Sequence, residues 1–235
     1  MNYAQTLESQ ISRVLGEHPR LSVQVGEDAY LLTGTLVLNA EYAGIPLYDE
    51  YGVEIKVPFD FPMKLPLVRS LDDMIPDGFE HAYADGGLCL GASCDLYTYI
   101  EEHNSVSTFI SGIVMSYLYS ASYFRRYGKV PYGERSHGIQ GIIEAYCERY
   151  SVQELNILID LLMITGDLKP YRGHLLCPCN SGKRLRHCHG TAILKDLQSP
   201  MSSVYKSDAR TIIRWYIQRL KEREEYHGNK STAEK

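Results

Sequence analysis

The sequence contains no apolar run that approaches the roughly 20 residues with which a helix crosses a bilayer. Its opening residues, Met-Asn-Tyr-Ala-Gln, lack the basic and apolar regions of a secretion signal. The net charge of −5 leaves no general excess of basic groups, which argues against whole-molecule affinity for nucleic acid or anionic lipid. We therefore expect a cytoplasmic protein that does not bind membranes.

Cysteine is sparse over most of the chain and concentrated in one place. Three of the six cysteines fall between positions 177 and 188. Such clustering, without a recognisable secretion signal, indicates metal binding in a reducing compartment rather than disulfides. Hydrophobic residues make up 44% of the 235 positions, which is enough for a packed core, so we do not expect a disordered chain.

Hydrophobic periodicity in the first third of the chain predicts a helix followed by an antiparallel meander. Val53, Ile55 and Val57 alternate with charged residues, so these three are expected to face a core. Pro58 ends this strand, because proline cannot donate a hydrogen bond to a sheet ladder. The predicted elements are a helix over 7–16 and strands over 21–25, 29–38, 51–57 and 67–68.

The remainder of the chain is predicted to be loop and helix. Residues 70–104 carry turn signals and little periodicity, so we expect mostly loop there. A segment over 107–127 follows the 3.6-residue period and stops at Gly128, which predicts a long helix. Further helices are expected over 139–150, 152–164 and 203–226. A meander flanked by helices places the chain in the α+β class.

The most specific motif is a pair of cysteines one residue apart, Cys177 and Cys179, followed nine residues later by Cys188 and then His189. Three thiolates and one imidazole form a tetrahedral donor set that suits Zn²⁺. Because the protein fills all four positions, we expect the zinc to be structural rather than catalytic.

The surroundings of this motif leave two questions open. His187 or His174 is an alternative fourth ligand to His189. Between positions 169 and 195 there are six basic residues and no acidic ones, which either offset the negative charge of three thiolates or contact a partner. A basic zinc knuckle also suits nucleic acid, but Tyr171 is the only aromatic platform here, so we favour protein docking or charge balance.

Residues 177–190 resemble the SEC-C motif, a short zinc-binding module found at the end of the bacterial translocase SecA and appended to many other bacterial proteins. The resemblance includes the turn Asn180-Ser-Gly182, where the family usually has Gly-Ser-Gly. It implies zinc binding and often a protein contact.

A cysteine outside the cluster stands out by its position. Cys89 follows two glycines, which let the backbone turn sharply and leave the sulfur approachable. Since the thiolate is the reactive form of cysteine, a thiol presented in this way is suited to carrying an acyl group. His81 either assists proton transfer or pins the loop, and the alternative for Cys89 is a small buried hydrophobe. Cys94 is the alternative nucleophile, and Cys147 is expected to be a core residue.

Residues 1–127 resemble the ubiquitin-conjugating enzyme fold. The stretch Val57-Pro-Phe-Asp-Phe-Pro62-Met-Lys-Leu-Pro66-Leu-Val68 reproduces the proline spacing of that family. His81-Ala-Tyr then leads to Gly86-Gly-Leu-Cys89-Leu90, where the family has His-Pro-Asn and then Gly-x-Ile/Leu-Cys-Leu. The resemblance implies an antiparallel sheet with flanking helices, followed here by a helical C-terminal region that carries a small zinc knuckle.

The same resemblance implies that Cys89 forms a thioester with a protein C-terminus and passes it to a lysine amine, with His81 in support. No Gly-rich phosphate loop followed by Lys-Ser or Lys-Thr is present, so an activating enzyme or an already activated partner is implied. The family's Asn, which stabilises the oxyanion, is replaced by Tyr83. Either another group such as Asn104, His103 or a backbone amide substitutes for it, or the chemistry stops at thioester transfer.

Stand-alone proteins of this type occur in bacterial antiphage (CBASS) operons, where they act on a cGAS/DncV-like nucleotidyltransferase. The expected substrate is therefore such a nucleotidyltransferase or a ubiquitin-like protein with a free C-terminus. Two other functions stay open: a non-catalytic adaptor with this fold, and a nucleic-acid binder that acts through the zinc module. The expected organisation is a ubiquitin-conjugating-like catalytic domain over 1–132, a helical extension over 133–170, a SEC-C-like zinc module over 171–194, a C-terminal helix over 195–226 and a disordered tail over 227–235.

Overall fold

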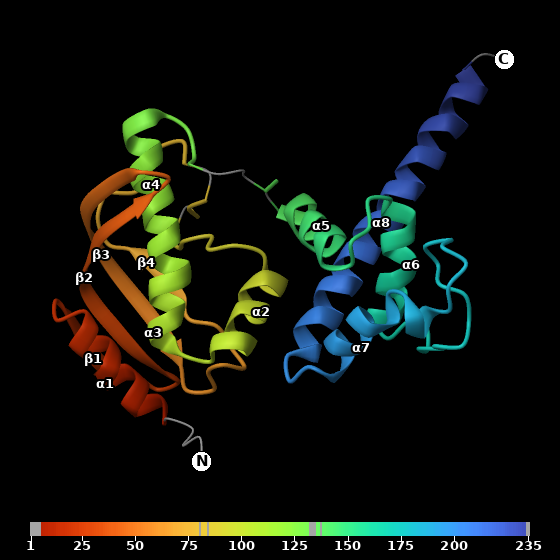
Figure 1. Ribbon diagram of the computed structural model, residues 1–235. Helices are drawn as coiled ribbons and strands as arrows, with labels where there is room; N and C mark the ends of the chain where they lie inside the picture. The colour runs from red at the N-terminus through yellow and green to blue at the C-terminus, as the bar shows by residue number, and fades with distance from the viewer. Residues whose placement is uncertain (1–5, 80, 84, 132–134, 137, 234–235) are drawn as a thin grey trace. The chain divides into compact units, whose positions relative to one another are not determined.

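A computed structural model describes the chain over residues 6–79, 81–83, 85–131, 135–136 and 138–233, with the backbone alone for 226–233 (Figure 1). The chain divides into two units. The first comprises Met1–Gly91 and Asp95–Glu134, and the second comprises Ala92–Cys94 and Arg135–Lys235. The finer domain limits expected from the sequence, at residues 132, 170, 194 and 226, stay predictions.

The first unit contains a four-stranded antiparallel sheet in the order β1-β2-β3-β4, so the predicted meander is confirmed. The helix before it begins after Thr6, whose hydroxyl accepts a hydrogen bond from the amide of Ser9 at 3.3 Å. With the helices described below, the sheet makes this an α+β structure. The elements are α1 (Leu7–Glu17), β1 (Leu21–Val25), β2 (Ala29–Tyr42), β3 (Ile45–Pro58) and β4 (Leu67–Ser70).

Strands β2 and β3 are longer than predicted and pair along their full lengths, as far as Tyr42 opposite Ile45. Only Ala43 and Gly44 connect them, with φ values of 51° and 78°. Positive φ at both central residues is typical of the two-residue turn whose twist matches a tight hairpin. Because Ala-Gly is a weaker turn signal than Asn-Gly, the sequence indicated strands only up to residue 38 and from residue 51.

One face of the sheet is buried, as the alternation in β3 predicts. Val53, Ile55 and Val57 are at most 1% exposed. Helix α4 (Met115–Tyr127) runs across this sheet (Figure 1). The hydroxyl of Tyr51 in β3 donates to the main-chain oxygen of Leu118 in α4 at 3.2 Å, so a hydrogen bond as well as apolar packing holds the helix to the sheet.

The helix predicted over 107–127 is confirmed but is not uniform. It begins as α3 (Val106–Thr108) and continues as the π-helical segment η1 (Phe109–Val114) before α4, which ends at Gly128. Within η1, a Cβ at position 112 would lie 2.0 Å from the hydroxyl oxygen of Tyr99, so any larger residue there would displace the Tyr99 ring. The π-helical turn therefore coincides with the point where Tyr99 packs against the helix.

The prediction that residues 70–104 are mostly loop is wrong in its last third. Helix α2 (Ser93–His103) occupies this part. Tyr97 and Ile100 are buried three residues apart on it, which is helical spacing. The segment carries few aliphatic residues and begins with polar ones, so the 3.6-residue helical period is not visible in its sequence.

The second unit is helical, and two of its features differ from expectation. Helix α7 begins directly after the zinc motif, in a segment for which the sequence predicts no separate helix. Helix α8 continues to Ala233, beyond residue 226, where the sequence indicates the end of the helix; residues 234–235 lie outside the described residues. The elements are α5 (Gly138–Arg149), α6 (Leu155–Thr165), η2 (Leu185–His187), α7 (Gly190–Gln198) and α8 (Ser202–Ala233).

A network around one buried carboxylate joins four of these helices. Asp196 of α7 is 1% exposed and accepts hydrogen bonds from Arg149 Nε at 3.0 and 3.1 Å and from the hydroxyl of Tyr150 at 2.7 Å. The Tyr150 hydroxyl also lies 2.6 Å from Thr165 Oγ1 at the end of α6. The Arg149 guanidinium stacks 4.5 Å above the ring of Tyr205 in α8. A buried carboxylate with these partners fixes the position of α7.

Among the helices that the structure describes, none combines the length and the apolar character needed to cross a bilayer.

Candidate functional site

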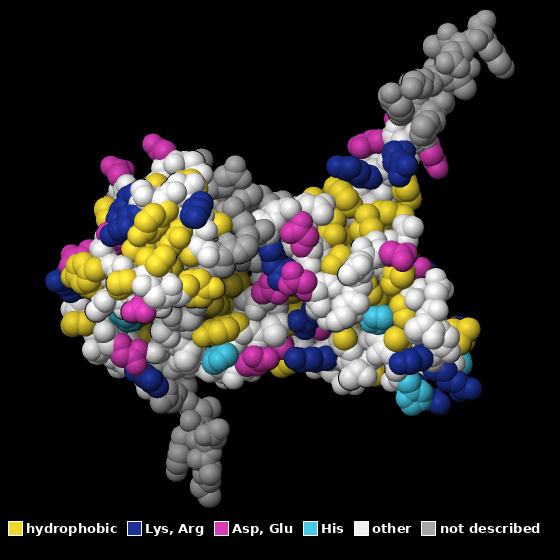
Figure 2. All heavy atoms as spheres, turned by 45° about the horizontal axis from the view of Figure 1, so that its top comes forward, with side chains coloured by type: hydrophobic (Ala, Val, Ile, Leu, Met, Phe, Trp, Pro, Cys, Tyr) yellow, Lys and Arg dark blue, Asp and Glu magenta, His cyan; other side chains and the backbone are white. Residues whose placement is uncertain are grey.

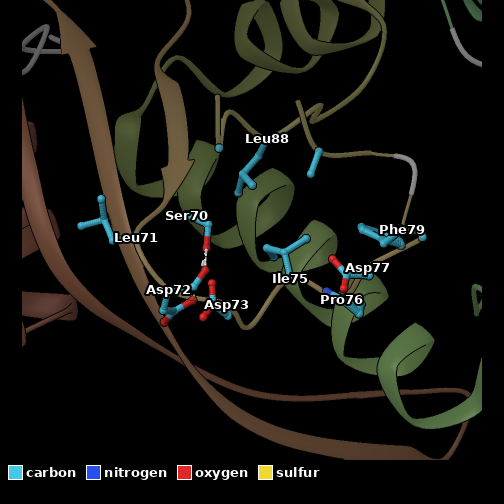
Figure 3. Close-up of a pocket in the computed structure, with 12 residues that line it drawn as sticks. Ser70, Leu71, Asp72, Asp73, Ile75, Pro76, Asp77, Phe79 and Leu88 are labelled. Atoms are coloured by element: carbon cyan, nitrogen blue, oxygen red, sulfur yellow. Dashed lines mark hydrogen bonds between the residues drawn. The ribbon is translucent and has the colours of Figure 1, made fainter. Parts of the chain in front are cut away.

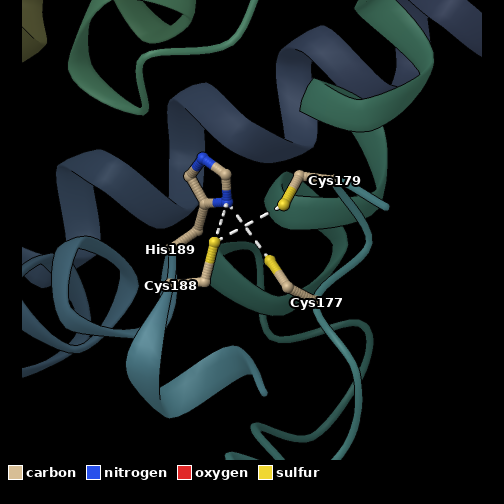
Figure 4. A group of neighbouring side chains, drawn as sticks. All are labelled: Cys177, Cys179, Cys188 and His189. Atoms are coloured by element: carbon tan, nitrogen blue, oxygen red, sulfur yellow. Dashed lines mark hydrogen bonds between the residues drawn. The ribbon is translucent and has the colours of Figure 1, made fainter. Parts of the chain in front are cut away.

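The four predicted zinc ligands meet at one point of the second unit (Figure 4). The sulfurs of Cys177, Cys179 and Cys188 and a ring nitrogen of His189 all lie within 4.8 Å of one another. His189 Nδ1 lies 3.2 Å from the Cys177 sulfur and 3.4 Å from the Cys188 sulfur, which in turn lies 3.4 Å from the Cys179 sulfur. With metal–sulfur bonds of about 2.3 Å, tetrahedral ligands are separated by roughly 3.5–4 Å, so one Zn²⁺ fits this cluster.

The alternative fourth ligands are not part of the cluster. His187 and His174 are exposed, and His187 Nε2 accepts a hydrogen bond from Arg186 Nε at 3.0 Å. The ring nitrogen that faces the sulfurs belongs to His189, through Nδ1. His189, rather than His187 or His174, is therefore the histidine of the cluster that could hold a metal ion.

The knuckle obtains its shape from a tight turn. The amide of Cys177 donates to the oxygen of Lys183 at 2.8 Å, which closes the loop between the two. Asn180 and Gly182 adopt positive φ values of 58° and 71°, as the sharp reversal requires. The hydroxyl of Ser181 lies 3.1 Å from the Cys179 sulfur. The Asn-Ser-Gly turn thus brings a hydrogen-bonding group to the thiols.

The metal-free thiols differ in acidity. Burial raises the pKa of Cys177 to about 11. Burial acts in the same direction on Cys179, but hydrogen bonds from the Ser181 hydroxyl and amide outweigh it and lower the pKa of Cys179 to about 6. Metal binding displaces the thiol protons. Cys177, which has the raised pKa, therefore loses its proton at neutral pH only when the metal binds.

His189 is held in place by the helix that follows it. It is the N-terminal cap residue of α7, and its carbonyl accepts the amide of Ile193 at 3.1 Å. Gly190 comes next, where a Cβ would lie 2.5 Å from the oxygen of Leu185 and 2.6 Å from the hydroxyl of Tyr171. Only glycine allows η2 and α7 to meet this closely, so the ligand pair Cys188 and His189 is positioned by close backbone packing.

The second candidate site is the loop that carries Cys89 in the first unit. Its backbone is hydrogen-bonded to the edge strand β4: the amide of Leu88 donates to Val68 at 2.8 Å, and the amide of Ser70 donates to Gly86 at 2.9 Å. Gly86 has a φ of 84°, which supplies the turn. The loop that presents the thiol is therefore continuous with the sheet rather than free of it.

The thiol itself is half-buried and hydrogen-bonded. The hydrogen bond from His81 is the largest influence and lowers the pKa of Cys89; partial burial opposes it, while the Tyr83 hydroxyl and the amide of Gly91 act with His81. Three donors around one sulfur favour its thiolate form, which is the nucleophile.

His81 contributes through its backbone as well as its ring. Its carbonyl accepts the amide of Cys89 at 2.7 Å and the hydroxyl of Tyr117 at 3.0 Å. Its ring packs edge-on against Phe79, with the ring centres 5.1 Å apart. The two roles considered from the sequence, fixing the loop and acting on the thiol, are therefore compatible in one residue.

A pocket of about 450 Å³ opens beside the thiol. Cys89 and Tyr83 both line it, together with apolar residues such as Leu67 and Leu96 and the charged Lys56 and Arg69. From the sequence, Tyr83 is only the replacement of an Asn, and its contact with the sulfur is not predicted. Its spacing, two residues after His81 and six before Cys89, does not by itself indicate that contact.

The two side chains expected to replace the missing Asn, those of His103 and Asn104, do not line this pocket. The His103 ring stacks on Tyr99 at 4.1 Å, and its Nδ1 lies 2.8 Å from the Tyr99 main-chain oxygen. Asn104 follows α2 with a φ of 42° and is exposed. The backbone amide of Gly91 is the one expected type of donor that contacts Cys89.

The remaining cysteines outside the metal cluster are poor nucleophiles. Cys94 is fully buried in α2, so the sequence-based alternative of Cys94 as a nucleophile in a polar loop is wrong. Cys147 is half-buried on α5, and burial raises its pKa.

A larger hollow of about 830 Å³ lies elsewhere on the first unit (Figure 3). Its acidic residues include Asp72, which accepts hydrogen bonds from Ser70 Oγ at 3.2 Å and from the amide of Met74 at 3.1 Å. The Gly52 amide donates to the same carboxylate. These contacts shape the loop after β4, so Asp72 acts as a structural cap rather than as a ligand.

Comparison with known proteins agrees with the metal site. The family model of the SEC-C motif matches residues 175–191, a span that contains all four clustered ligands. No curated protein matches the chain.

Proposed function

We propose that this protein is a ubiquitin-conjugating-like acyl carrier, in which Cys89 forms a thioester with a protein C-terminus and transfers it to a lysine amine. The observation that carries the proposal is the state of the thiol: half-buried, with a lowered pKa, contacted by His81 and Tyr83 and open to a pocket. The order of helix, antiparallel meander and long helix, and the resemblance of residues 1–127 to that family, support it.

The chemistry requires an acyl group that is already activated. The Cys89 thiolate attacks the carbonyl carbon of a thioester or acyl adenylate; the carbon–sulfur bond to Cys89 forms as the former thiolate or AMP departs. A lowered thiol pKa increases the fraction of thiolate available for this attack at neutral pH. An activating enzyme, or a partner that arrives activated, supplies the acyl group.

The substrate follows from the resemblance and is part of the proposal. Proteins of this type act in CBASS antiphage operons on the C-terminus of a cGAS/DncV-like nucleotidyltransferase, so that C-terminus is the proposed acyl group here. A ubiquitin-like protein is the other candidate donor. Intact-mass measurement after co-expression with operon neighbours distinguishes the two by the mass of the adduct.

The zinc module is proposed to serve structure and docking. Cys177, Cys179, Cys188 and His189 would hold Zn²⁺ in a closed four-ligand site, where the metal supplies structural cross-linking. Beside the knuckle, Leu175 is 49% and Leu176 is 70% exposed.

A test of the acyl-carrier proposal needs no natural partner. A fluorescent peptide ending in a glycine thioester of mercaptoethanesulfonate loads a reactive thiolate by thioester exchange. We expect one peptide adduct per chain by intact-mass spectrometry at neutral pH, removed by dithiothreitol. Cys89→Ala is expected to abolish it, whereas the matched variant Cys147→Ala is expected to retain it. An adduct of equal yield on Cys89→Ala rejects Cys89 as the carrier.

A non-catalytic adaptor is the second candidate, favoured by the apolar and basic surface of the zinc module. Figure 2 shows dark blue and cyan side chains gathered at the right-hand end of this unit, with yellow ones among them. A pocket of about 290 Å³ lies between Leu175, Leu176, Lys169 and Arg172, which suits an acidic protein segment with an apolar side chain. A Cys89 thiol that is inert to iodoacetamide at neutral pH favours the adaptor. Binding to DNA or RNA that weakens steeply with salt favours a nucleic-acid partner instead.

A further inference from the structure

Tyr83 occupies the position at which the ubiquitin-conjugating family carries its oxyanion-stabilising Asn. It stands two residues after His81, in the sequence His-Ala-Tyr rather than His-Pro-Asn. The loop therefore loses an amide donor and has a phenol at the same place. A phenol is longer than an amide side chain, so its hydroxyl reaches further from the same backbone position.

The backbone of Tyr83 is fixed on both sides. Its amide donates to the oxygen of Gly87 at 2.8 Å, and its carbonyl accepts the amide of Gly86 at 2.9 Å. The neighbouring residues Ala82 and Leu88 form an antiparallel bridge. The backbone of Tyr83 is thus held against the segment 86–88, which leads to Cys89.

The ring of Tyr83 passes closely over Gly87. A Cβ added to Gly87 would lie 3.3 Å from the Tyr83 ring carbon Cδ2, which is tighter than an ordinary contact. Glycine at position 87 therefore makes room for the ring. The ring remains 61% exposed at the rim of the 450 Å³ pocket, and its hydroxyl is hydrogen-bonded to the Cys89 sulfur.

The phenol remains a donor at neutral pH. The Cys89 sulfur, through its hydrogen bond and its charge, raises the pKa of Tyr83 above the ordinary value, since ionising both groups would place two negative charges side by side. An acylated sulfur carries no charge, but the ordinary pKa of a phenol, near 10, keeps the hydroxyl proton in place at neutral pH in that state too.

We propose that the Tyr83 hydroxyl donates the hydrogen bond that stabilises the oxyanion when an amine attacks the Cys89 thioester. The proposal rests on the proposed acyl-carrier function of Cys89. Tyr83 would then fill the role left open by the missing Asn, with the backbone amide of Gly91 as a second donor beside the Cys89 sulfur.

Transfer of the acyl group from Cys89 to the amine proceeds through a tetrahedral intermediate. The neutral amine nitrogen attacks the thioester carbon, a carbon–nitrogen bond forms, and the carbonyl oxygen takes up the negative charge. The intermediate collapses as the carbon–sulfur bond breaks; Cys89 leaves as a thiolate, and the extra amine proton passes to water. The Tyr83 hydroxyl donates a hydrogen bond to the oxyanion and returns to the sulfur afterwards, without transferring its proton.

The test separates loading from discharge. Wild type and Tyr83→Phe are loaded with the peptide thioester of mercaptoethanesulfonate, freed of excess reagent, and discharged by free lysine in a single turnover. Removal of one oxyanion donor costs about 10²–10³-fold in rate elsewhere, so we expect aminolysis to slow by about 10²-fold in Tyr83→Phe while the thioester still forms. Tyr48→Phe, another exposed tyrosine of the same unit, is expected to discharge at the wild-type rate.

A second readout distinguishes a donor from a merely structural ring. Loss of the hydroxyl alone is expected to move the pH profile of Cys89 alkylation to higher pH, because one of the donors to the thiolate is removed. Equal discharge rates for wild type and Tyr83→Phe overturn the proposal for Tyr83 while leaving Cys89 as the carrier. Failure of the wild type to form any Cys89 thioester overturns the acyl-carrier function itself.

Discussion

Tyr117 and His81 are joined by a hydrogen bond that ties the long central helix to the thiol loop. The Tyr117 hydroxyl in α4 donates to the His81 carbonyl at 3.0 Å, and the same carbonyl accepts the amide of Cys89 at 2.7 Å. One main-chain oxygen thus connects the helix that packs on the sheet with the residue proposed to carry an acyl group. The position of the sulfur is set by the core rather than by the loop alone.

Replacing this tyrosine tests the connection. Tyr117→Phe removes one hydrogen bond but leaves the His81 carbonyl paired with Cys89, so we expect a loss of about 1 kcal/mol in the free energy of unfolding. Urea denaturation measures it. Loading of Cys89 by the peptide thioester is expected to slow without being lost. Unchanged stability together with unchanged loading shows that the Tyr117 bond does not support the loop.

The two half-buried cysteines outside the metal cluster are expected to differ in pH dependence. Hydrogen bonding by His81 lowers the pKa of Cys89, and burial raises that of Cys147. Alkylation by iodoacetamide, followed by peptide mapping across pH 6–10, should therefore reach half its maximal rate at lower pH for Cys89. His81→Gln is expected to move the Cys89 profile upward and leave that of Cys147 in place.

The lowered pKa of Cys89 makes the free energy of unfolding depend on pH. A thiol whose pKa is lowered in the folded state stabilises the fold fully above its ordinary pKa, near 8.5–9. The stabilisation is lost as the pH falls through the lowered value. The stability difference between wild type and Cys89→Ala is therefore expected to grow as the pH rises from 6 to 9, as measured by urea denaturation. A constant difference over this range would show that the folded and unfolded pKa values are equal.

Metal content is predicted to depend on four residues. Wild-type protein is expected to bind close to one zinc ion per chain by elemental analysis, and Cys188→Ser or His189→Ala is expected to lower this retention during dialysis against a chelator. His187→Ala and His174→Ala are matched controls, because neither belongs to the cluster, and both should retain the metal. Loss of zinc from His187→Ala but not from His189→Ala would reassign the fourth ligand.

The buried network of the second unit should be costly to break. Asp196 and Arg149 are 1% and 13% exposed, and removal of one partner of a buried ion pair typically costs about 3–5 kcal/mol. We expect Asp196→Ala to lower the midpoint of chemical denaturation accordingly. The pair Lys169–Asp160 is about half exposed, so Asp160→Ala should cost about 1 kcal/mol or less. Comparable losses in both variants would contradict the importance of burial.

The features that the sequence predicts well are those with local signals. The helix before the sheet, the alternation of Val53, Ile55 and Val57 and the stop at Gly128 each depend on residues close in the chain. The zinc ligands belong to this group too, because their spacing alone brings them together. The turn before Cys89 also has a local signal, since Gly86 adopts the positive φ that it needs, while the acyl-carrier role of Cys89 stays a prediction.

The features that the sequence does not predict depend on contacts made only in the folded chain. Helix α2 is marked by the burial of Tyr97 and Ile100 rather than by an apolar stripe. The outer half of the β2–β3 hairpin is held by pairing, since its Ala-Gly turn is a weak signal. The contact of Tyr83 with Cys89 depends on how the loop folds back over Gly87, which residue type and spacing do not show.

The place of His189 at the start of α7 makes metal affinity and helix packing parts of one equilibrium. The residue that faces the sulfurs and the buried Asp196 belong to the same helical segment. A metal that binds the folded knuckle more tightly than the unfolded one stabilises α7 by an amount that grows with the logarithm of the free metal concentration. Reciprocally, a substitution that loosens the packing of α7 lowers the apparent affinity for the metal, by at most the free energy of unfolding that it removes.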